Sequence, residues 1–282
     1  MKIGFCMLLW TGHVTRKHRK ILEDLKATGY DGVQVPVFEG EVSDYEKIGR
    51  MLDDIGLEAT SIAVFPTTKQ NPLSDKEADR KRALKHLRWI VDCTAALNAR
   101  QTAGPLHQTI GHFTGHPPTK VEKQRARELH LRIADYAAER KVTIVVEAIN
   151  RFESYFVNTM DDLAAYLDTV NHPAITGMYD TFHANLEEKD PVSAFTRNLR
   201  HMSHVHISEN DRGVPGRGHV PWEATFKAIK GSGYDGWLTI EAFGRFLPDL
   251  AAATRVWRDL HDSPEQVYRE GYKTIRNGWD AA

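Results

Sequence analysis

Four short apolar runs in the second half of the sequence each end in a residue type that binds metal ions. These runs are Val145-Val146-Glu147, Met178-Tyr179-Asp180, His204-Val205-His206 and Thr239-Ile240-Glu241. Three carboxylates and one imidazole form a hard, oxygen-rich donor set, which suits Mn²⁺, Mg²⁺ or Co²⁺ better than a metal that prefers thiolates. Three negative charges in one place repel each other, and a divalent cation is the simplest reason for them to coexist. The pattern therefore predicts one divalent metal site at Glu147, Asp180, His206 and Glu241.

The elements that must position these ligands are β-strands. Successive side chains of a strand alternate between its two faces, so Glu147 shares a face with Val145, and Asp180 shares one with Met178. If the strands are parallel and form a barrel, their carboxyl ends meet at one mouth, where barrel enzymes carry their active sites. We therefore expect the four ligands to converge on the barrel axis.

Strand-like runs and amphipathic stretches alternate along the whole chain. Eight runs are predicted to be strands: Lys2–Met7, Gly32–Val37, Leu57–Val64, Gln101–Leu106, Val142–Glu147, Ile175–Asp180, Met202–Ile207 and Trp237–Ala242. The predicted helices are Arg16–Thr28, Tyr45–Ile55, Lys76–Leu97, Lys120–Arg140, Met160–Val170, Pro191–Asn198, Trp222–Lys230, Leu247–Leu260 and Pro264–Trp279. A βα unit that occurs eight times is typical of the α/β class and of the (β/α)₈ TIM barrel.

The chain is expected to form a single domain over residues 1–282, because no linker rich in glycine, serine or proline divides it. A C-terminal helical extension is expected at about residues 264–279. Two similar turns, Gly29–Gly32 and Gly233–Gly236, place a glycine where a helix C-terminus needs a left-handed residue. The alternative architecture is an open doubly wound sheet. It would usually carry a glycine-rich phosphate loop after the first strand, and residues 7–12 do not have that pattern.

Composition excludes several classes of protein. The 282 residues carry 37 Lys and Arg against 38 Asp and Glu, a net charge of −1, which disfavours a nucleic-acid-binding protein. No run approaches the ~18 apolar residues of a membrane span, so no membrane partner is expected. Cys6 and Cys93 have no metal-ligand spacing around them and are expected to be buried free thiols. We expect a cytoplasmic protein.

Longer residue strings around the four ligands carry a resemblance to a known family. Glu147-Ala148-Ile149-Asn150-Arg151-Phe152-Glu153 follows the fifth strand, and Asp180-Thr181-Phe182-His183-Ala184-Asn185-Leu186-Glu187-Glu188 follows the sixth. His206-Ile207-Ser208-Glu209-Asn210-Asp211-Arg212 leads into Pro215-Gly216-Arg217-Gly218. From about Val142 to Phe243 the chain resembles the ketose 3-epimerases of the xylose-isomerase-like barrel superfamily, which act on D-tagatose, D-allulose (psicose) or L-ribulose.

The resemblance implies a role for seven residues. Glu147, Asp180, His206 and Glu241 would bind one divalent metal ion, commonly Mn²⁺ in this family, and Glu147 and Glu241 would also be the acid–base pair. Glu153, His183 and Arg212 would bind the O1–O3 end of a small-molecule sugar. The resemblance also implies a homodimer or homotetramer. Of the 14 histidines, only His206 and His183 are therefore assigned to the site.

The chemistry of a ketose supports the same roles. The hydrogen on C3 is α to the C2 carbonyl but too weakly acidic to leave without help, and a chelated metal would stabilise the cis-enediolate that forms. Inversion at C3 needs one group on each face of the sugar, and Glu147 and Glu241 lie on different strands. One base on a single face would instead favour exchange between C1 and C2. An aldose–ketose or hydroxypyruvate-type isomerase of the same superfamily is therefore the alternative.

The first half of the chain fits the family less well. Val64-Phe65-Pro66 and the segment from Gly104 to Phe113 replace loops that contact the C4–C6 end of the sugar in the relatives. His107 is therefore a candidate contact for a larger or more polar substrate, such as an oxidised glycoside or a sugar acid. Trp10, Phe65, Phe113 and Phe246 are candidates either for the pocket wall or for ordinary barrel packing.

Two alternatives from other classes are weaker. A DNA-repair endonuclease of the superfamily shares Asp180-Thr181-Phe182-His183, but it needs Asp-x-His after the seventh strand, where this chain has Asp211-Arg212-Gly213. The neutral net charge also disfavours DNA as a partner. A non-catalytic sugar-binding barrel would have no need of both Glu147 and Glu241.

Overall fold

The eight predicted strands form one closed parallel barrel in which each strand pairs with the next along the chain, and the eighth pairs with the first. The computed structural model describes all residues from 1 to 282. The strands are β1 (Lys2–Cys6), β2 (Gly32–Pro36), β3 (Glu58–Ile62), β4 (Gln101–Gly104), β5 (Thr143–Glu147), β6 (Ile175–Asp180), β7 (Met202–Ile207) and β8 (Trp237–Ile240). The predicted (β/α)₈ TIM barrel with a single domain is confirmed.

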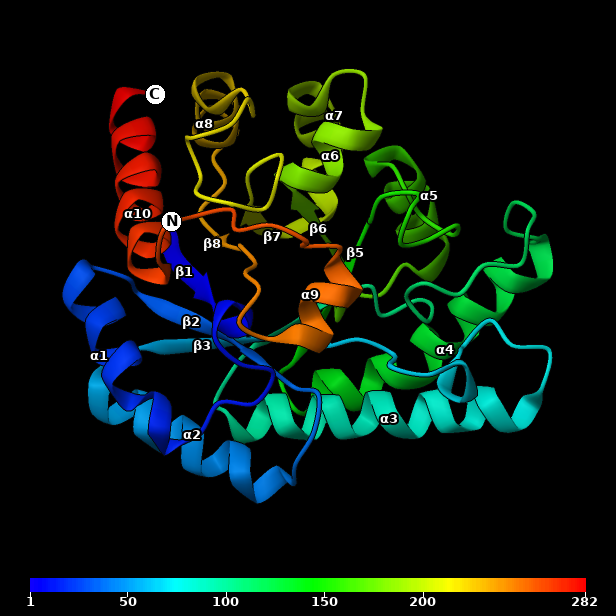
Figure 1. Cartoon of the computed structure of the whole chain (residues 1–282). Helices are drawn as coiled ribbons and strands as arrows, with labels where there is room; N and C mark the ends of the chain where they lie inside the picture. The colour runs from blue at the N-terminus through cyan, green and yellow to red at the C-terminus, as the bar shows by residue number, and fades with distance from the viewer.

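A ring of helices surrounds the barrel (Figure 1). They are α1 (Arg19–Thr28), α2 (Val42–Ile55), α3 (Glu77–Ala96), α4 (Lys120–Glu139), α5 (Met160–Val170), α6 (Thr181–Glu187), α7 (Pro191–Arg197), α8 (Trp222–Gly231), α9 (Pro248–Thr254) and α10 (Pro264–Ala281). The last helix, α10, contacts α1, α8, β1 and β8, so it closes the ring where the two ends of the barrel sequence meet. None of the helices is long and apolar enough to cross a membrane.

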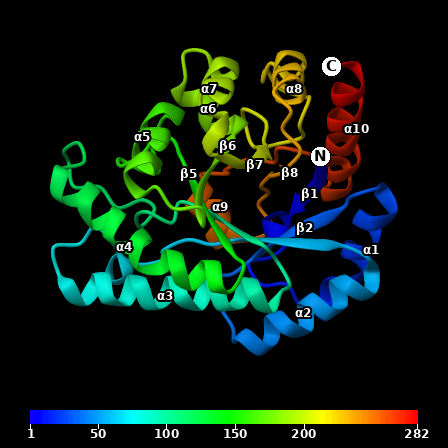
Figure 2. The ribbon, with the colours of Figure 1, turned by 180° about the vertical axis from the view of Figure 1, so that it is seen from behind.

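Two helices differ from the sequence-based expectation. The predicted helix Leu247–Leu260 is only the seven-residue α9, because the chain turns at Arg255, whose φ of 61° is left-handed. This helix lies in front of the strands in Figure 1 and behind them in Figure 2, so it covers one mouth of the barrel. Helix α6 was not expected. It begins directly after β6, where the Asp180 side chain accepts a hydrogen bond from the Phe182 N–H at 2.7 Å.

Other local predictions are confirmed. Helix α1 ends at Gly29 with a left-handed φ of 116°, and Gly233, just after α8, has a φ of 75°. Cys6 and Cys93 are buried free thiols. The main apolar core lies between strands and helices, and it includes large fully buried side chains such as Tyr30 and Phe195.

Inside the barrel the packing is mixed. A small apolar cluster of Ala103, Val145 and Met178 fills one part of the interior, directly below the ends of β5 and β6. Polar side chains fill another part, and Gln34 and His204 among them are completely buried. The strand register places Asp180 opposite His206, and His206 opposite Thr239, so the ends of the last strands lie level with one another.

Candidate active site

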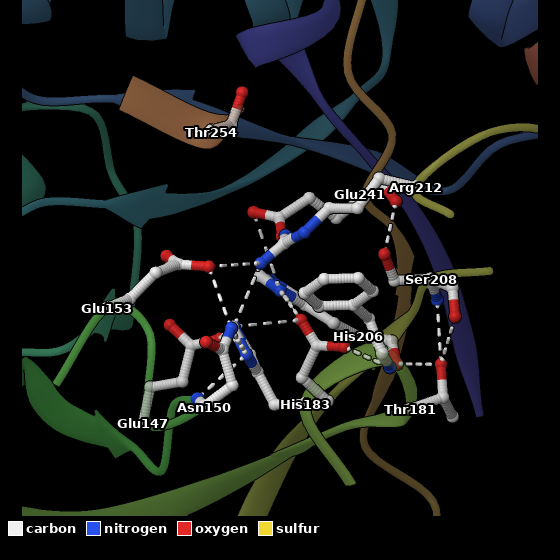
Figure 3. Close-up of polar contacts among 12 residues, drawn as sticks. Glu147, Asn150, Glu153, Thr181, His183, His206, Ser208, Arg212, Glu241 and Thr254 are labelled. Atoms are coloured by element: carbon white, nitrogen blue, oxygen red, sulfur yellow. Dashed lines mark hydrogen bonds and ion pairs between the residues drawn. The ribbon is translucent and has the colours of Figure 1, made fainter. Parts of the chain in front are cut away.

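The four predicted metal ligands meet at the carboxyl ends of four consecutive strands. Glu147 and Asp180 are the last residues of β5 and β6, His206 lies on β7, and Glu241 directly follows β8. All four are at most 4% exposed. Figure 3 shows the side chains of Glu147, His206 and Glu241 together with the three residues expected to bind sugar. Alternation along parallel strands therefore places them as the sequence predicts.

Candidate ligand atoms form two groups that share Asp180, and each group could hold a metal ion. Ligand atoms of Asp180, His206 and Glu241 all lie within 4.8 Å of one another, and those of Glu147, Asp180 and His183 do the same. His206 Nδ1 is 3.5 Å from Asp180 Oδ2 and 3.6 Å from Glu241 Oε1. Asp180 Oδ2 and His206 Nδ1 are buried and make no hydrogen bond. Buried polar atoms without partners are rare, so these two atoms, facing each other among carboxylates, fit a metal site.

His183 lies beside this cluster, and donors hold both nitrogens of its ring. Its Nδ1 is 3.1 Å from the Asn150 backbone nitrogen and 3.0 Å from the Asn150 side-chain amide nitrogen. Its Nε2 is 2.9 Å from Arg212 Nη2, and a guanidinium can only donate. That Nε2 is 3.6 Å from Glu147 Oε1 and faces the pocket.

Arg212 is a buried cation in the centre of the site. Its guanidinium forms an ion pair with Glu241 and lies 3.8 Å from Glu153 Oε1. The same group stacks on two aromatic rings, with Cζ 4.0 Å from the Phe182 centroid and 4.7 Å from that of Phe243. Stacking and ion pairing on several sides fix the orientation of an arginine. The structure therefore brings Glu153, His183 and Arg212 together around the predicted acid–base pair.

The loop that carries Arg212 is organised by Glu209, a residue to which the sequence reasoning gave no role. The Glu209 carboxylate is 1% exposed and accepts hydrogen bonds from the N–H groups of Asn210, Gly216 and Val220 at 2.8–3.1 Å, and from the Trp222 indole at 2.8 Å. Its own carbonyl accepts from the Arg212 N–H at 2.9 Å. The sequence feature that could have indicated this role is the position of Glu209, an acidic residue in a loop rich in glycine and proline.

The two glutamates of the expected acid–base pair have opposite pKa shifts. Burial raises the pKa of Glu147 well above its ordinary value, and the nearby carboxylates add to this. Burial also acts on Glu241, but His206 and the contacting Arg212 outweigh it and lower the pKa. Two carboxylates whose pKa values are pushed apart can take the roles of acid and base.

A cavity of about 630 Å³ opens above these residues. Charged and polar groups line its inner end, and apolar residues line the wall that faces them. From β1–β4 and their loops come Leu8, Gly12, Phe38, Ile62, Val64, Phe65, Pro66, Pro105 and Ile110, and the α9 segment adds Leu247, Pro248, Asp249, Leu250, Ala253 and Thr254. The pocket therefore has one charged end and one mainly apolar side.

Some sequence-based candidates lie elsewhere. His107 is completely buried, stacks on Phe156 with a centroid distance of 5.3 Å, and does not line the cavity, so it is not a substrate contact in this structure. Of the four aromatic candidates for the pocket wall, only Phe65 lines the cavity. Trp10 packs on Phe5, and Phe113 and Phe246 are largely exposed. Contacts with segments far away in the sequence determine where these side chains lie.

Comparison with known proteins places this site in a family. A family model described as "Xylose isomerase-like TIM barrel" matches residues 22–277. A ketose 3-epimerase from Arthrobacter globiformis is 30% identical over 280 residues, which cover 98% of this chain and 96% of that protein. A probable ketose 3-epimerase from Synechocystis sp. is 28% identical with the same coverage.

A solved structure agrees with the sequence relatives. The crystal structure of a D-allulose 3-epimerase from Methylomonas sp. in complex with D-allulose is 26% identical and superposes with a TM-score of 0.92. The match covers 98% of this chain and 96% of that one. The chain belongs to the xylose isomerase-like TIM barrels and, within them, to the ketose 3-epimerases, enzymes of the isomerase class.

Proposed function

We propose that this enzyme inverts C3 of a free ketose in a reaction that depends on one divalent metal ion, with Mn²⁺ as the expected ion and Mg²⁺ or Co²⁺ as alternatives. The observation that carries the proposal is the pair of buried carboxylates, Glu147 on β5 and Glu241 after β8, which reach one cavity from different strands. Their opposite pKa shifts support an acid and a base that act together. The names of the relatives support the same reaction.

Asp180 and His206 would hold the metal together with the two glutamates. Their unpartnered buried atoms, Asp180 Oδ2 and His206 Nδ1, support this assignment. A divalent ion bound there would polarise the C2 carbonyl of the ketose and stabilise the negative charge that develops when C3 loses its proton.

Three residues would fix the O1–O3 end of the sugar at this charged end of the pocket. Arg212 Nη2 donates to His183 Nε2 at 2.9 Å, so the two side chains are fixed together, and the guanidinium N–H groups of Arg212 would donate to sugar oxygens. Glu153 lies near Arg212 and lines the cavity, so its carboxylate can accept from a sugar hydroxyl. Such fixed donors and acceptors orient C3 between the two glutamates.

The proton transfer needs one group on each face of C3. Glu241, held ionised by Arg212 and His206, would remove the C3 proton of one epimer. Glu147, whose pKa is raised by burial, would deliver a proton to the opposite face. The reverse reaction exchanges the two roles, so one proton enters and one leaves in each turnover, with no redox change.

Incubation in D₂O with a panel of ketoses tests the proposal. Metal-stripped enzyme is supplied with Mn²⁺ and mixed with D- and L-ketohexoses and ketopentoses, and the products are followed by NMR. Deuterium at C3 together with the C3 epimer is the expected result, and chelator should abolish it. Exchange at C1 with formation of an aldose would instead indicate the isomerase, and no exchange with any ketose would refute the proposal.

Assembly and location are part of the same proposal. We expect a homodimer or homotetramer, as the resemblance to the family implies. Light scattering coupled to size exclusion measures the subunit number. Two buried cysteines without a disulfide are consistent with the proposed cytoplasmic location.

A further inference from the structure

A continuous row of hydrogen-bonded side chains runs through the barrel interior beneath His206. His206 Nε2 is 3.0 Å from Gln34 Oε1, and Gln34 Nε2 is 3.5 Å from His204 Nε2. His204 Nδ1 is 3.0 Å from Gln101 Oε1, and Gln101 Nε2 donates to the Ser203 carbonyl at 3.0 Å. The row joins β2, β4 and β7, and it connects the metal-binding mouth to the opposite end of the barrel.

The chemistry of these groups fixes the direction of every bond in the row. The Ser203 carbonyl can only accept, so Gln101 must turn its amide nitrogen to it and its oxygen to His204. His204 Nδ1 must then carry a proton, and Nε2 of the neutral ring must accept.

The same reasoning continues upward to the metal site. Because His204 Nε2 accepts, Gln34 must present its amide nitrogen to it and its oxygen to His206. His206 Nε2 must therefore donate, and Nδ1 is the nitrogen that faces Asp180 and Glu241. One backbone carbonyl at the far end of the barrel thus determines the orientation of each group up to the ligand.

We propose that Gln34, His204 and Gln101 are positioning residues that hold His206 in the tautomer and ring orientation needed to bind the metal through Nδ1. The inference rests on the metal site of the proposed function. Ligand histidines in metalloproteins are commonly held by a hydrogen bond to their second nitrogen. Here that partner is the neutral amide Gln34, which is itself held by the buried His204, and His204 is held by Gln101.

The burial of these groups argues against a role in packing alone. Gln34 and His204 are 0% exposed, and buried polar groups cost free energy unless every hydrogen bond is made. Ala103, Val145 and Met178 show that this barrel fills the neighbouring interior with apolar side chains. A polar row at one place in the interior therefore points to a function at that place.

Metal affinity provides the first test, and it does not depend on turnover. Mn²⁺ is titrated into metal-stripped protein for wild type, Gln34→Met and Gln34→Glu, with folding checked by circular dichroism. Methionine keeps the volume of Gln34 but offers Nε2 of His206 no oxygen, and the affinity should fall about 10- to 100-fold. Glutamate restores an acceptor and should restore the affinity.

Thr102→Val is the matched control, because Thr102 is a buried residue next to Gln101, on the other face of β4, whose hydroxyl makes no hydrogen bond. It should bind Mn²⁺ as wild type does. Gln101→Met breaks the row at the third group from His206 and should weaken Mn²⁺ binding by a smaller factor. If Gln34 served local packing alone, Gln101→Met would leave Mn²⁺ affinity unchanged. Wild-type affinity in both Gln34→Met and Gln101→Met would overturn the proposal.

The tautomer of His204 provides the second test and needs only the wild-type protein and one reference variant. In ¹H–¹⁵N spectra of the Mg²⁺-loaded protein with labelled histidine, His204 should be neutral and protonated on Nδ1, with its signals identified by their absence from His204→Gln. Protonation on Nε2 would contradict the proposed direction. If these results hold but no ketose is epimerised, the proposed function fails and the positioning row stands.

Discussion

The two halves of the barrel contribute opposite surfaces to one pocket. The end of the cavity formed by β5–β8 carries Glu147, Glu153, His183, Arg212 and Glu241, whereas β1–β4 and their loops contribute only apolar residues and Gly12. The charged half is buried and held by fixed hydrogen bonds and stacking. The apolar half offers contact area without directional bonds.

This difference suggests that the charged half determines the rate of the chemical step and the apolar half determines how tightly the substrate binds. Acid–base catalysis requires groups placed to within a hydrogen-bond length, and the strand ends of β5–β8 provide that placement. An apolar wall binds ground state and transition state about equally, because dispersion and burial change little when a proton moves. We therefore expect changes in the charged half to lower kcat and changes in the apolar wall to raise KM.

The largest expected effect is the loss of one member of the acid–base pair. Glu147→Gln and Glu241→Gln each remove a group proposed to exchange a proton on one face of C3, and kcat should fall about 10²- to 10⁴-fold. Steady-state kinetics with the best ketose of the panel measures the loss. Glu46→Gln, at an exposed position of α2 far from the pocket, is the control and should leave kcat unchanged. Full activity of Glu241→Gln would break the division between the two halves.

A second prediction concerns the rigidity of the charged half and rests on Glu209. Hydrogen bonds from Asn210, Trp222 and the loop N–H groups outweigh burial and hold the pKa of Glu209 below its ordinary value. Glu209→Gln replaces one acceptor oxygen with a donor that faces N–H groups, which should cost about 2 kcal/mol at pH 7. The melting temperature should then fall by roughly 5 °C.

The pH dependence of this loss follows from the direction of the shift. A carboxyl whose pKa is lower in the folded state stabilises the protein above the unfolded pKa, near 4.3, and the stabilisation is lost as the pH falls through the folded value. Thermal unfolding should therefore show the same difference between wild type and Glu209→Gln at pH 7 and pH 6, and a shrinking difference below about pH 4. A difference that does not depend on pH would show that the Glu209 charge does not hold the loop.

Sequence reasoning predicted the charged half better than the apolar half, for a physical reason. The ligands lie at the ends of parallel strands, and strand alternation together with barrel closure places Glu147, Asp180, His206 and Glu241 without knowledge of any side-chain packing. The contacts of His107 with Phe156, and the short α9 that ends at Arg255, depend on which distant segments pack together. A residue pattern carries no direct information on such contacts.

The same reason explains which polar residues were missed. Gln34, Gln101 and His204 come from three strands far apart in the sequence, and only the closed barrel brings them into one row. Helix α6 was missed because Asp180 is at once the last residue of β6 and the N-cap of the helix, with no loop between them. A strand that passes directly into a helix shows none of the turn residues by which the sequence marks boundaries.

The smallest predicted effect tests the apolar half directly. Phe38 is half-buried and lines the cavity beside Leu8 and Ile62. If the O1–O3 end of the sugar binds at the charged residues, as proposed, the C4–C6 end would face this wall. Phe38→Leu removes part of that contact, about 1 kcal/mol, and should raise KM for a ketohexose about fivefold at constant kcat. A ketopentose lacks C6, so its KM should change less. Steady-state kinetics of Phe38→Leu with both sugars therefore distinguishes an effect on substrate binding from an effect on the chemical step. An equal fall of kcat for both sugars would show that the apolar wall takes part in the chemistry.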